Sequence, residues 1–198
     1  MADQMIHLEF SMQEIFNLIP QIADNIIRQS ETAARLSEGF KDNEIRMAFE
    51  FDEHAYSLII RNGREFISGN GNLENPMVRV SMTMADLQNL IRVKHAGLFL
   101  HYEKNSGRFN ENKPVSIFKT ISGMKGKIVS ELKLDDGSIS RISYVFNQVE
   151  TPMATITLTM DTLDSLFKGK DNPVNLFMAG QLQIDGDMTL AMQLQSIF

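Results

Sequence analysis

The side chains in this sequence that could bind a metal or carry out catalysis are few and widely separated. The four histidines are His7, His54, His95 and His101, and the chain has no cysteine. His95 and His101, with Glu103 nearby, lack the i, i+4 spacing that places two zinc ligands on one helix face. We therefore predict no metal site and no cofactor.

Two short motifs resemble ligand loops but are incomplete. Asp185-Gly186-Asp187 lacks the remaining oxygen ligands of a calcium loop, so we interpret it as a turn that caps a helix. The stretch GMKGK, residues 123–127, lacks the spacing and the following Ser or Thr of a phosphate-binding loop. No Ser, His and Asp set has motif support either. We predict no catalytic residues and no enzyme activity.

The composition is that of an ordinary globular protein. The chain has 198 residues, of which 43% are hydrophobic and 22% charged, which is enough for one large or two small domains. The net charge of −6 would repel a phosphate backbone, so we predict no nucleic-acid partner. The lack of cysteine suits a reducing compartment, and we predict a cytoplasmic location. No apolar run has the length of a signal peptide or a membrane span.

The apolar pattern predicts a helix at the start of the chain and a set of strands after it. Apolar residues recur every three or four positions over residues 12–34, with Pro20 either kinking this helix or opening a second one. The period then changes to two, which predicts strands over 44–51 and 56–60, a hairpin turn at Asn62-Gly63 and a strand over 64–68.

The rest of the chain alternates strands with short helices. We expect Thr83 or Asp86, Asp161, Asn172 and Asp187 to cap helices. The strands are predicted over 78–82, 98–102, 127–134, 139–146, 154–159 and 181–185, and the helices after 83, over 114–121, after 161, after 172 and from 187.

The sequence contains an internal similarity. Residues 74–91, ENPMVRVSMTMADLQNLI, align without a gap to residues 150–167, ETPMATITLTMDTLDSLF, with 7 of 18 positions identical. A competing alignment pairs PVSIF at 114–118 with PVNLF at 173–177, and both cannot describe one simple duplication. We interpret residues 1–112 as a degenerate helix-and-strand repeat and residues 113–198 as the main unit.

The main unit resembles the sterol carrier protein type-2 family. The resemblance is strongest over residues 156–198 and depends on a threonine-rich strand, a leucine-rich helix and a series of short motifs. These motifs are Gly169-Lys170, Asn172-Pro173, Phe177, Gly180, Leu182, Ile184, Gly186-Asp187-Met188, Leu190-Ala191-Met192 and Leu194-Gln195. Gln181 and Gln183 stand where lysines are common in the family, which leaves the contribution of basic residues open.

The resemblance implies an α+β fold with a mostly antiparallel curved sheet and helices packed on one face, in a single or duplicated form. It also implies non-catalytic binding or carriage of an apolar lipid, such as a fatty acid, acyl-CoA, sterol-like molecule or phospholipid, in a hydrophobic tunnel between sheet and helices. We predict that apolar residues of both layers line the tunnel. They are Phe146, Ile156, Leu158, Leu163, Leu166, Phe167, Leu176, Phe177, Met188, Ala191, Leu194 and Phe198.

The same apolar residues also fit a second function. If the methionines and phenylalanines fill the space between the layers, the protein is an accessory or dimerisation module whose apolar terminal helix docks a partner. An apolar lipid or fatty-acyl ligand is the partner in the first hypothesis. Transient membrane contact and a homodimer are left open by the sequence.

Overall fold

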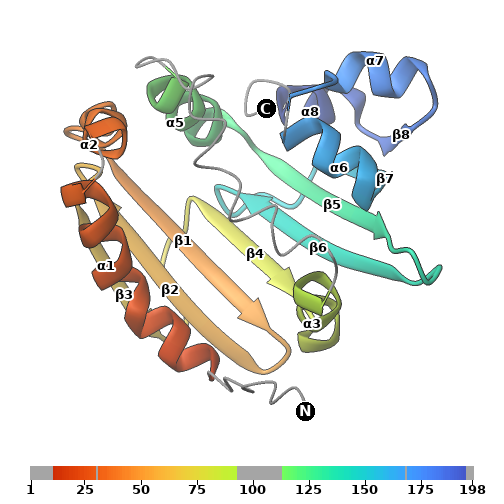
Figure 1. Ribbon diagram of the computed structural model, residues 1–198. Helices are drawn as coiled ribbons and strands as arrows, with labels where there is room; N and C mark the ends of the chain where they lie inside the picture. The colour runs from red at the N-terminus through yellow and green to blue at the C-terminus, as the bar shows by residue number, and fades with distance from the viewer. Residues whose placement is uncertain (1–10, 30, 93–112, 168, 195–198) are drawn as a thin grey trace, which may run out of the picture.

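All eight strands of the described residues belong to one sheet (Figure 1). The computed structural model describes residues 11–29, 31–92, 113–167 and 169–194. The strands are β1 (Glu44–Phe51), β2 (His54–Arg61), β3 (Glu65–Asn70), β4 (Val78–Met82), β5 (Gly126–Lys133), β6 (Ile139–Phe146), β7 (Met153–Thr159) and β8 (Leu182–Gly186). The helices are α1 (Met12–Gln29), α2 (Glu31–Glu38), α3 (Met84–Arg92), α5 (Lys113–Gly123), α6 (Met160–Phe167), α7 (Pro173–Met178) and α8 (Met188–Gln193).

The strand order across the sheet is β3-β2-β1-β4-β6-β5-β7-β8. The pairs β1/β4 and β5/β7 are parallel, and the other neighbouring strands are antiparallel. The predicted α+β class with a mostly antiparallel sheet is therefore confirmed. Strand pairing between β4 and β6 joins the two predicted units, 1–112 and 113–198, and their division remains a proposal.

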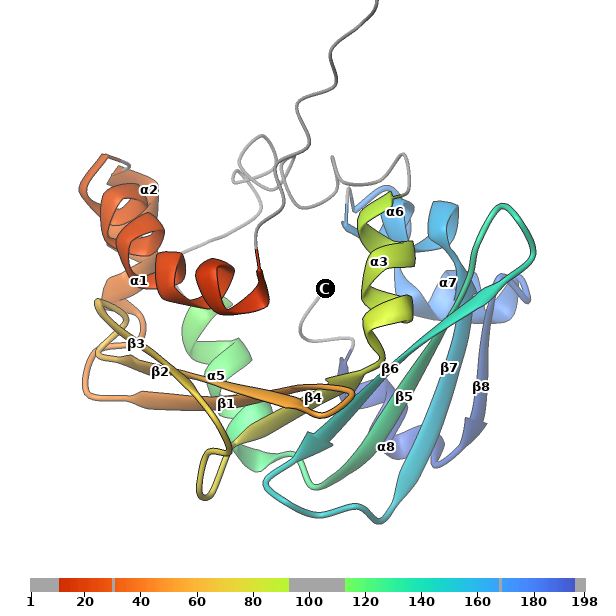
Figure 2. The same cartoon turned by 90° about the horizontal axis from the view of Figure 1, so that it is seen from below.

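One face of the sheet, which we call the inner face, is apolar across both halves. The strand registers place Phe49 beside Val80, Val80 beside Tyr144 and Tyr144 beside Ile128, and all four side chains lie on the inner face. Figure 2 shows the sheet bending so that α1, α3 and α6 stand on its concave side. Burial of apolar side chains between the sheet and these helices stabilises the packing of the two layers.

The opposite face, which we call the outer face, is polar. Ion pairs cross it from strand to strand: Glu44 with Arg61 at 2.6 Å, Glu50 with Arg79 at 3.2 Å and Glu131 with Arg141 at 2.9 Å. These groups remain partly exposed, so each pair contributes little to stability. Because their charged side chains favour contact with water, these pairs specify which face of the sheet is exposed and which is buried.

An aromatic cluster holds α1 on the N-terminal half of the sheet. Phe16 is 4% exposed and stacks on Tyr56 with ring centroids 4.7 Å apart, while Phe49 meets it edge-on at 5.1 Å. The helix runs through Pro20 as one element, and a separate short helix, α2, follows it. The predicted helix is thus present, and its proline lies in the interior.

Helix caps explain where the short helices begin. The side chains of Asn172 and Asp187 accept hydrogen bonds from the backbone N–H groups of Asn175 and Leu190, as predicted. Thr83 does the same for Asp86. The prediction that Asp161 caps α6 is wrong: Thr159 Oγ1 accepts from the Thr162 N–H, and Asp161 lies in the first turn. The helix begins two residues earlier than a cap at Asp161 would place it.

The two halves of the chain pair their strands in the same way. Met47 of β1 faces Leu58 on one side and Val78 on the other, and Ile128 of β5 faces Tyr144 and Ala154 in the same arrangement. Both β4 and β7 lead directly into a helix. The halves differ at the next strand: on the side away from β5, β7 pairs with β8, whereas on the side away from β1, β4 pairs with β6 of the other half. Duplication of the unit remains a proposal, and the predicted strand at 98–102 lies outside the described residues.

Candidate functional site

Most of the predicted lining residues come together in one apolar cluster on the inner face. Phe146, Ile156, Leu158, Leu166, Leu176 and Ala191 are buried in this cluster, and Leu163, Phe177 and Leu194 pack against it partly exposed. They come from β6, β7, α6, α7, α8 and the residue after α8. Both predicted layers are therefore present and face each other, and the tunnel between them stays a prediction.

Three predicted residues do not belong to this described cluster. Met188 is 41% exposed at the start of α8. The side chain of Phe167 and the whole of Phe198 lie outside the described part of the structure. Their roles stay predictions.

The cluster also contains residues that the sequence interpretation left out. Leu190 is 2% exposed, and Ile128 and Met124 are 0% and 1% exposed. The cap at Asp187 sets the rotation of α8, so that Leu190, Ala191 and Leu194 face the sheet and Met188 points outward. The cap was visible in the sequence, and counting positions from it would have identified Leu190 as a buried residue.

Polar groups interrupt the inner face in its middle. Burial raises the pKa of the Tyr144 phenol to about 12, and a hydrogen bond with Ser130 partly opposes this shift. Ser140, four residues earlier on the same face of β6, is fully buried, and its hydroxyl has no hydrogen-bond partner in the described structure. A buried hydroxyl without a partner is destabilising in an apolar cluster.

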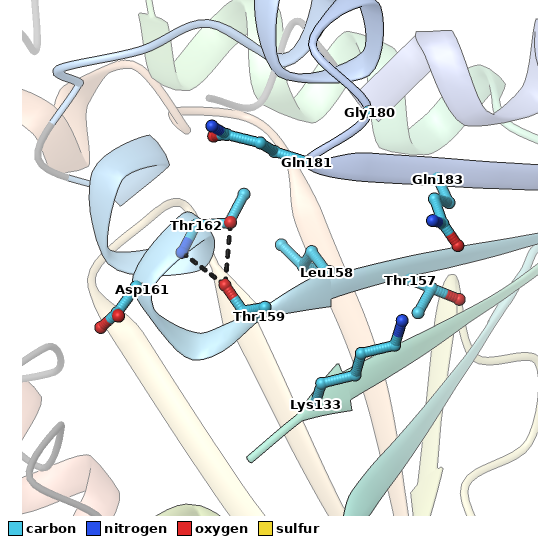
Figure 3. A pocket seen from close by; sticks show the side chains of 9 residues that line it. All are labelled: Lys133, Thr157, Leu158, Thr159, Asp161, Thr162, Gly180, Gln181 and Gln183. Carbon is cyan, nitrogen blue, oxygen red and sulfur yellow. Dashed lines mark hydrogen bonds between the residues drawn. The ribbon is translucent and has the colours of Figure 1, made fainter. Parts of the chain in front are cut away.

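A pocket of about 370 Å³ lies at the edge of the sheet, where β5, β7 and β8 meet the first turn of α6 (Figure 3). Seven of its nine lining residues have polar side chains; the nine are Lys133, Thr157, Leu158, Thr159, Asp161, Thr162, Gly180, Gln181 and Gln183. Leu158 is the residue that this pocket shares with the predicted lining of the tunnel. The pocket, which we call the edge pocket, therefore borders the apolar cluster without coinciding with it.

The polar side chains of the edge pocket are held by strand register and by a local cap. Thr157 lies directly opposite Gln183 of β8 and beside Glu131 of β5, which places its hydroxyl on the outer face. That hydroxyl donates to Glu131 Oε2 at 3.2 Å. Thr159 and Thr162 are fixed by their hydroxyl contact of 2.9 Å at the start of α6.

Other site classes find no support among the described residues. That part of the chain contains no group of three or more His, Cys, Asp or Glu side chains placed to hold a metal ion. None of its helices is long and apolar enough to cross a membrane.

Comparisons with solved structures returned sterol carrier proteins. The chain is 22% identical to Sterol Carrier Protein 2 from Yarrowia lipolytica in its apo form, with 52% of this chain and 97% of that chain covered and a TM-score of 0.35. It is 16% identical to Sterol Carrier Protein 2 Like 2 from Aedes aegypti, with 55% and 99% covered and a TM-score of 0.36. It is 20% identical to the sterol carrier protein domain 2 of Helicoverpa armigera, with 64% of this chain and 89% of that chain covered and a TM-score of 0.34.

The sequence comparisons give a local result. No curated protein matches the chain. The model of one family matches residues 116–198, which include α6, α7, β8, α8 and the strands β5, β6 and β7. This range contains every predicted lining residue, and the resemblance described from the sequence is confirmed: residues 116–198 match the model of the SCP-2 sterol transfer family.

Proposed function

We propose that this protein binds and carries an apolar lipid between the inner face of its C-terminal strands and the helices α6 and α8. The observation that carries the proposal is the coincidence of the family match, residues 116–198, with an apolar cluster built from two facing layers. A fatty acid, acyl-CoA, sterol-like molecule or phospholipid fits such a site, with no catalytic step. A cytoplasmic location and transient contact with a donor membrane complete the proposal.

The energetics of chain burial support it. Each buried methylene contributes about 0.8 kcal/mol, so a sixteen-carbon chain has a gross gain on the order of 12 kcal/mol before the costs of ordering it. Useful affinity therefore needs no strong polar contact inside the site. The aliphatic side chains of Ile156, Leu166 and Leu194 suit an alkyl chain, because they adapt their packing without leaving a polar atom unpaired.

The alternative function, a filled module whose terminal helix docks a partner, is less well supported. Leu190 and Ala191 of α8 are already buried, at 2% and 5% exposed, within the chain's own core. These side chains are not free for an intermolecular contact. The two functions can be separated by measuring lipid binding and association in the same samples.

The experiment is lipid recovery followed by direct binding. The full chain is purified without detergent, its bound lipids are identified by native mass spectrometry, and a fluorescent fatty acid is titrated into the delipidated protein. We expect a co-purified lipid and saturable binding at one site. If no lipid is recovered and neither a fluorescent fatty acid nor a fluorescent sterol binds, the carrier function is wrong.

A further inference from the structure

The C-terminal half of the chain lacks one strand that the N-terminal half has, and β4 takes its place. Strand β2 has β1 on one side and β3 on the other. Its counterpart β6 has β5 on one side, but residues 147–152, which lead from β6 to β7 and are all described, contain no strand equivalent to β3. Instead β4, which precedes the C-terminal half, pairs antiparallel with β6 at that position. The sheet of the C-terminal half is therefore completed by a strand from the other half.

This strand extends the apolar cluster beyond the family match. In the register of β4 with β6, Val78 lies opposite Phe146 and Val80 lies opposite Tyr144, all on the inner face. Both valines are buried in the cluster that contains most of the predicted lining residues. The cluster thus crosses the boundary between the two halves, although the family match begins only at residue 116.

Helix α3 follows β4 and is attached to β6 through Asp86. The β4/β6 ladder ends at the pair of Ser81 with Ser143. Beyond that pair, the backbone N–H of Arg141 donates to Asp86 Oδ1 at 3.1 Å. The other carboxylate oxygen, Asp86 Oδ2, accepts from the Thr83 hydroxyl at 2.7 Å, which fixes the side chain in the first turn of α3. One carboxylate therefore joins the start of this helix to the backbone of β6.

Leu90 carries this attachment into the apolar cluster. It follows Asp86 by four residues, so both side chains lie on the same face of α3. Leu90 is 8% exposed and belongs to the cluster. Helix α3 packs on β6, whereas α6 packs on β7 and α8 packs on β5 and β7, all on the concave side of the sheet (Figure 2). A lipid held on the inner face of these strands would therefore meet α3 along β6.

We propose that β4 and α3 form one wall of the lipid site, with Val80 and Leu90 in contact with the bound acyl chain. This inference rests on the proposed lipid-binding function and adds the part played by the N-terminal half. The two halves then build one composite site, which binds one lipid per chain. A separate second site in the N-terminal half is disfavoured, because Val78, Val80 and Leu90 are already buried in the shared cluster.

The first test is photochemical labelling of the full chain. Two palmitate analogues are used, one with a diazirine in the middle of its chain and one with a diazirine at its end. After irradiation, labelled peptides are identified by mass spectrometry, and labelling that excess palmitate suppresses is counted as specific. We expect a stoichiometry of one lipid per chain, with specific labels within residues 116–198 and also within residues 78–90.

The pattern of labels separates the composite site from the lipid-binding function. If both analogues label residues 116–198 alone, the composite site is wrong and lipid binding stands. If two analogues bind per chain and the second labels residues 44–82 only, each half has its own site and the proposal is also overturned. If neither analogue gives specific labels on the folded protein, the lipid-binding function fails and the composite site fails with it.

The second test compares Leu90→Ala with Leu58→Ala. Leu58 is the matched control, because it is a leucine of the N-terminal half with the same 8% exposure, lies on the inner face of β2 and is outside the apolar cluster. Both variants lose the same atoms from a buried position, so thermal unfolding should show similar destabilisation.

Palmitate affinity distinguishes the two variants. We expect Leu90→Ala to weaken palmitate binding about fourfold, which corresponds to the contact of about one buried methylene, and Leu58→Ala to leave it unchanged. Circular dichroism checks that both variants are folded, and the labelling of the wild type does not depend on either. Equal palmitate affinity in the two variants would show that Leu90 acts only through stability and would overturn its contact with the lipid.

Discussion

Gly126 at the start of β5 lies directly under Leu190 of α8. A β-carbon at residue 126 would stand 2.7 Å from Leu190 Cδ2 and 2.5 Å from the Pro152 carbonyl oxygen. The φ angle of Gly126 is also +134°, in a region that side-chain-bearing residues rarely adopt. This contact fixes the distance between the terminal helix and the sheet.

We expect Gly126→Ala to destabilise the protein by about 3 kcal/mol, because it combines backbone strain with a clash that displaces α8. Denaturant unfolding measures the change. Gly137→Ala is the control for strain alone, since Gly137 has φ +84° with open space around its α-carbon. Equal losses in the two variants would show that the contact with Leu190 plays no part.

The cap at Asp187 should determine how firmly α8 covers the cluster. Its carboxylate accepts from the Leu190 N–H at 2.7 Å, so Asp187→Ala should cost about 1 kcal/mol of stability. Asp187→Asn keeps an acceptor at the same position and should lie close to the wild type. Hydrogen exchange at Leu190 and Ala191 should quicken in the alanine variant alone, and faster exchange in both would contradict the capping role.

Leu194 provides a steric test of the lipid site. It follows α8 and packs against the cluster partly exposed, so Leu194→Trp should fill space that an alkyl tail needs and abolish fatty-acid binding while the chain stays folded. The matched control is Met178→Trp on α7, because Met178 is 79% exposed and outside the cluster. Fluorescent fatty-acid titration and thermal unfolding are measured on both. Undiminished binding in a folded Leu194→Trp would place the lipid elsewhere.

Tyr144 should make stability fall in strongly alkaline solution. Its pKa is raised to about 12 in the folded state by burial, from a value of 10.0 for an unburied phenol. Between these values the unfolded chain has released the proton and the folded chain retains it. The free energy of unfolding therefore decreases as the pH rises through this range.

The measurement is a pair of alkaline stability profiles, for the wild type and for Tyr144→Phe. The phenylalanine variant should lose less stability above pH 10. Ultraviolet titration should show one of the three tyrosines ionising about two pH units later than an exposed one. Parallel profiles in the two proteins would mean that Tyr144 is accessible to solvent in the folded state.

Several elements could be identified from local signals because those signals act within a few residues. The alternation over residues 44–51 and 139–146 predicted β1 and β6 with their observed ends. Asn62 and Gly63 adopt the positive φ angles, +53° and +66°, that their turn required. The caps at Asn172 and Asp187 are short-range hydrogen bonds, so their sequence spacing contained the necessary information.

The residues of the edge pocket could not be grouped from the sequence. Lys133, Thr157 and Gln183 lie 24 and 26 positions apart, by the differences 157 − 133 and 183 − 157. They become neighbours through the parallel register of β5 with β7 and the antiparallel register of β7 with β8. Such registers depend on which distant strands pair, which no local pattern specifies.

By itself the sequence determined the type of most of the described elements, the apolar faces and the family resemblance of residues 116–198, since these depend on periodicity, caps and contiguous motifs. The tertiary structure alone decided that β4 pairs with β6 and that a pocket lined mostly by polar residues borders the apolar cluster. The physical reason is that burial and strand pairing are settled between segments far apart in the chain, where many pairings satisfy the same local pattern and packing selects one.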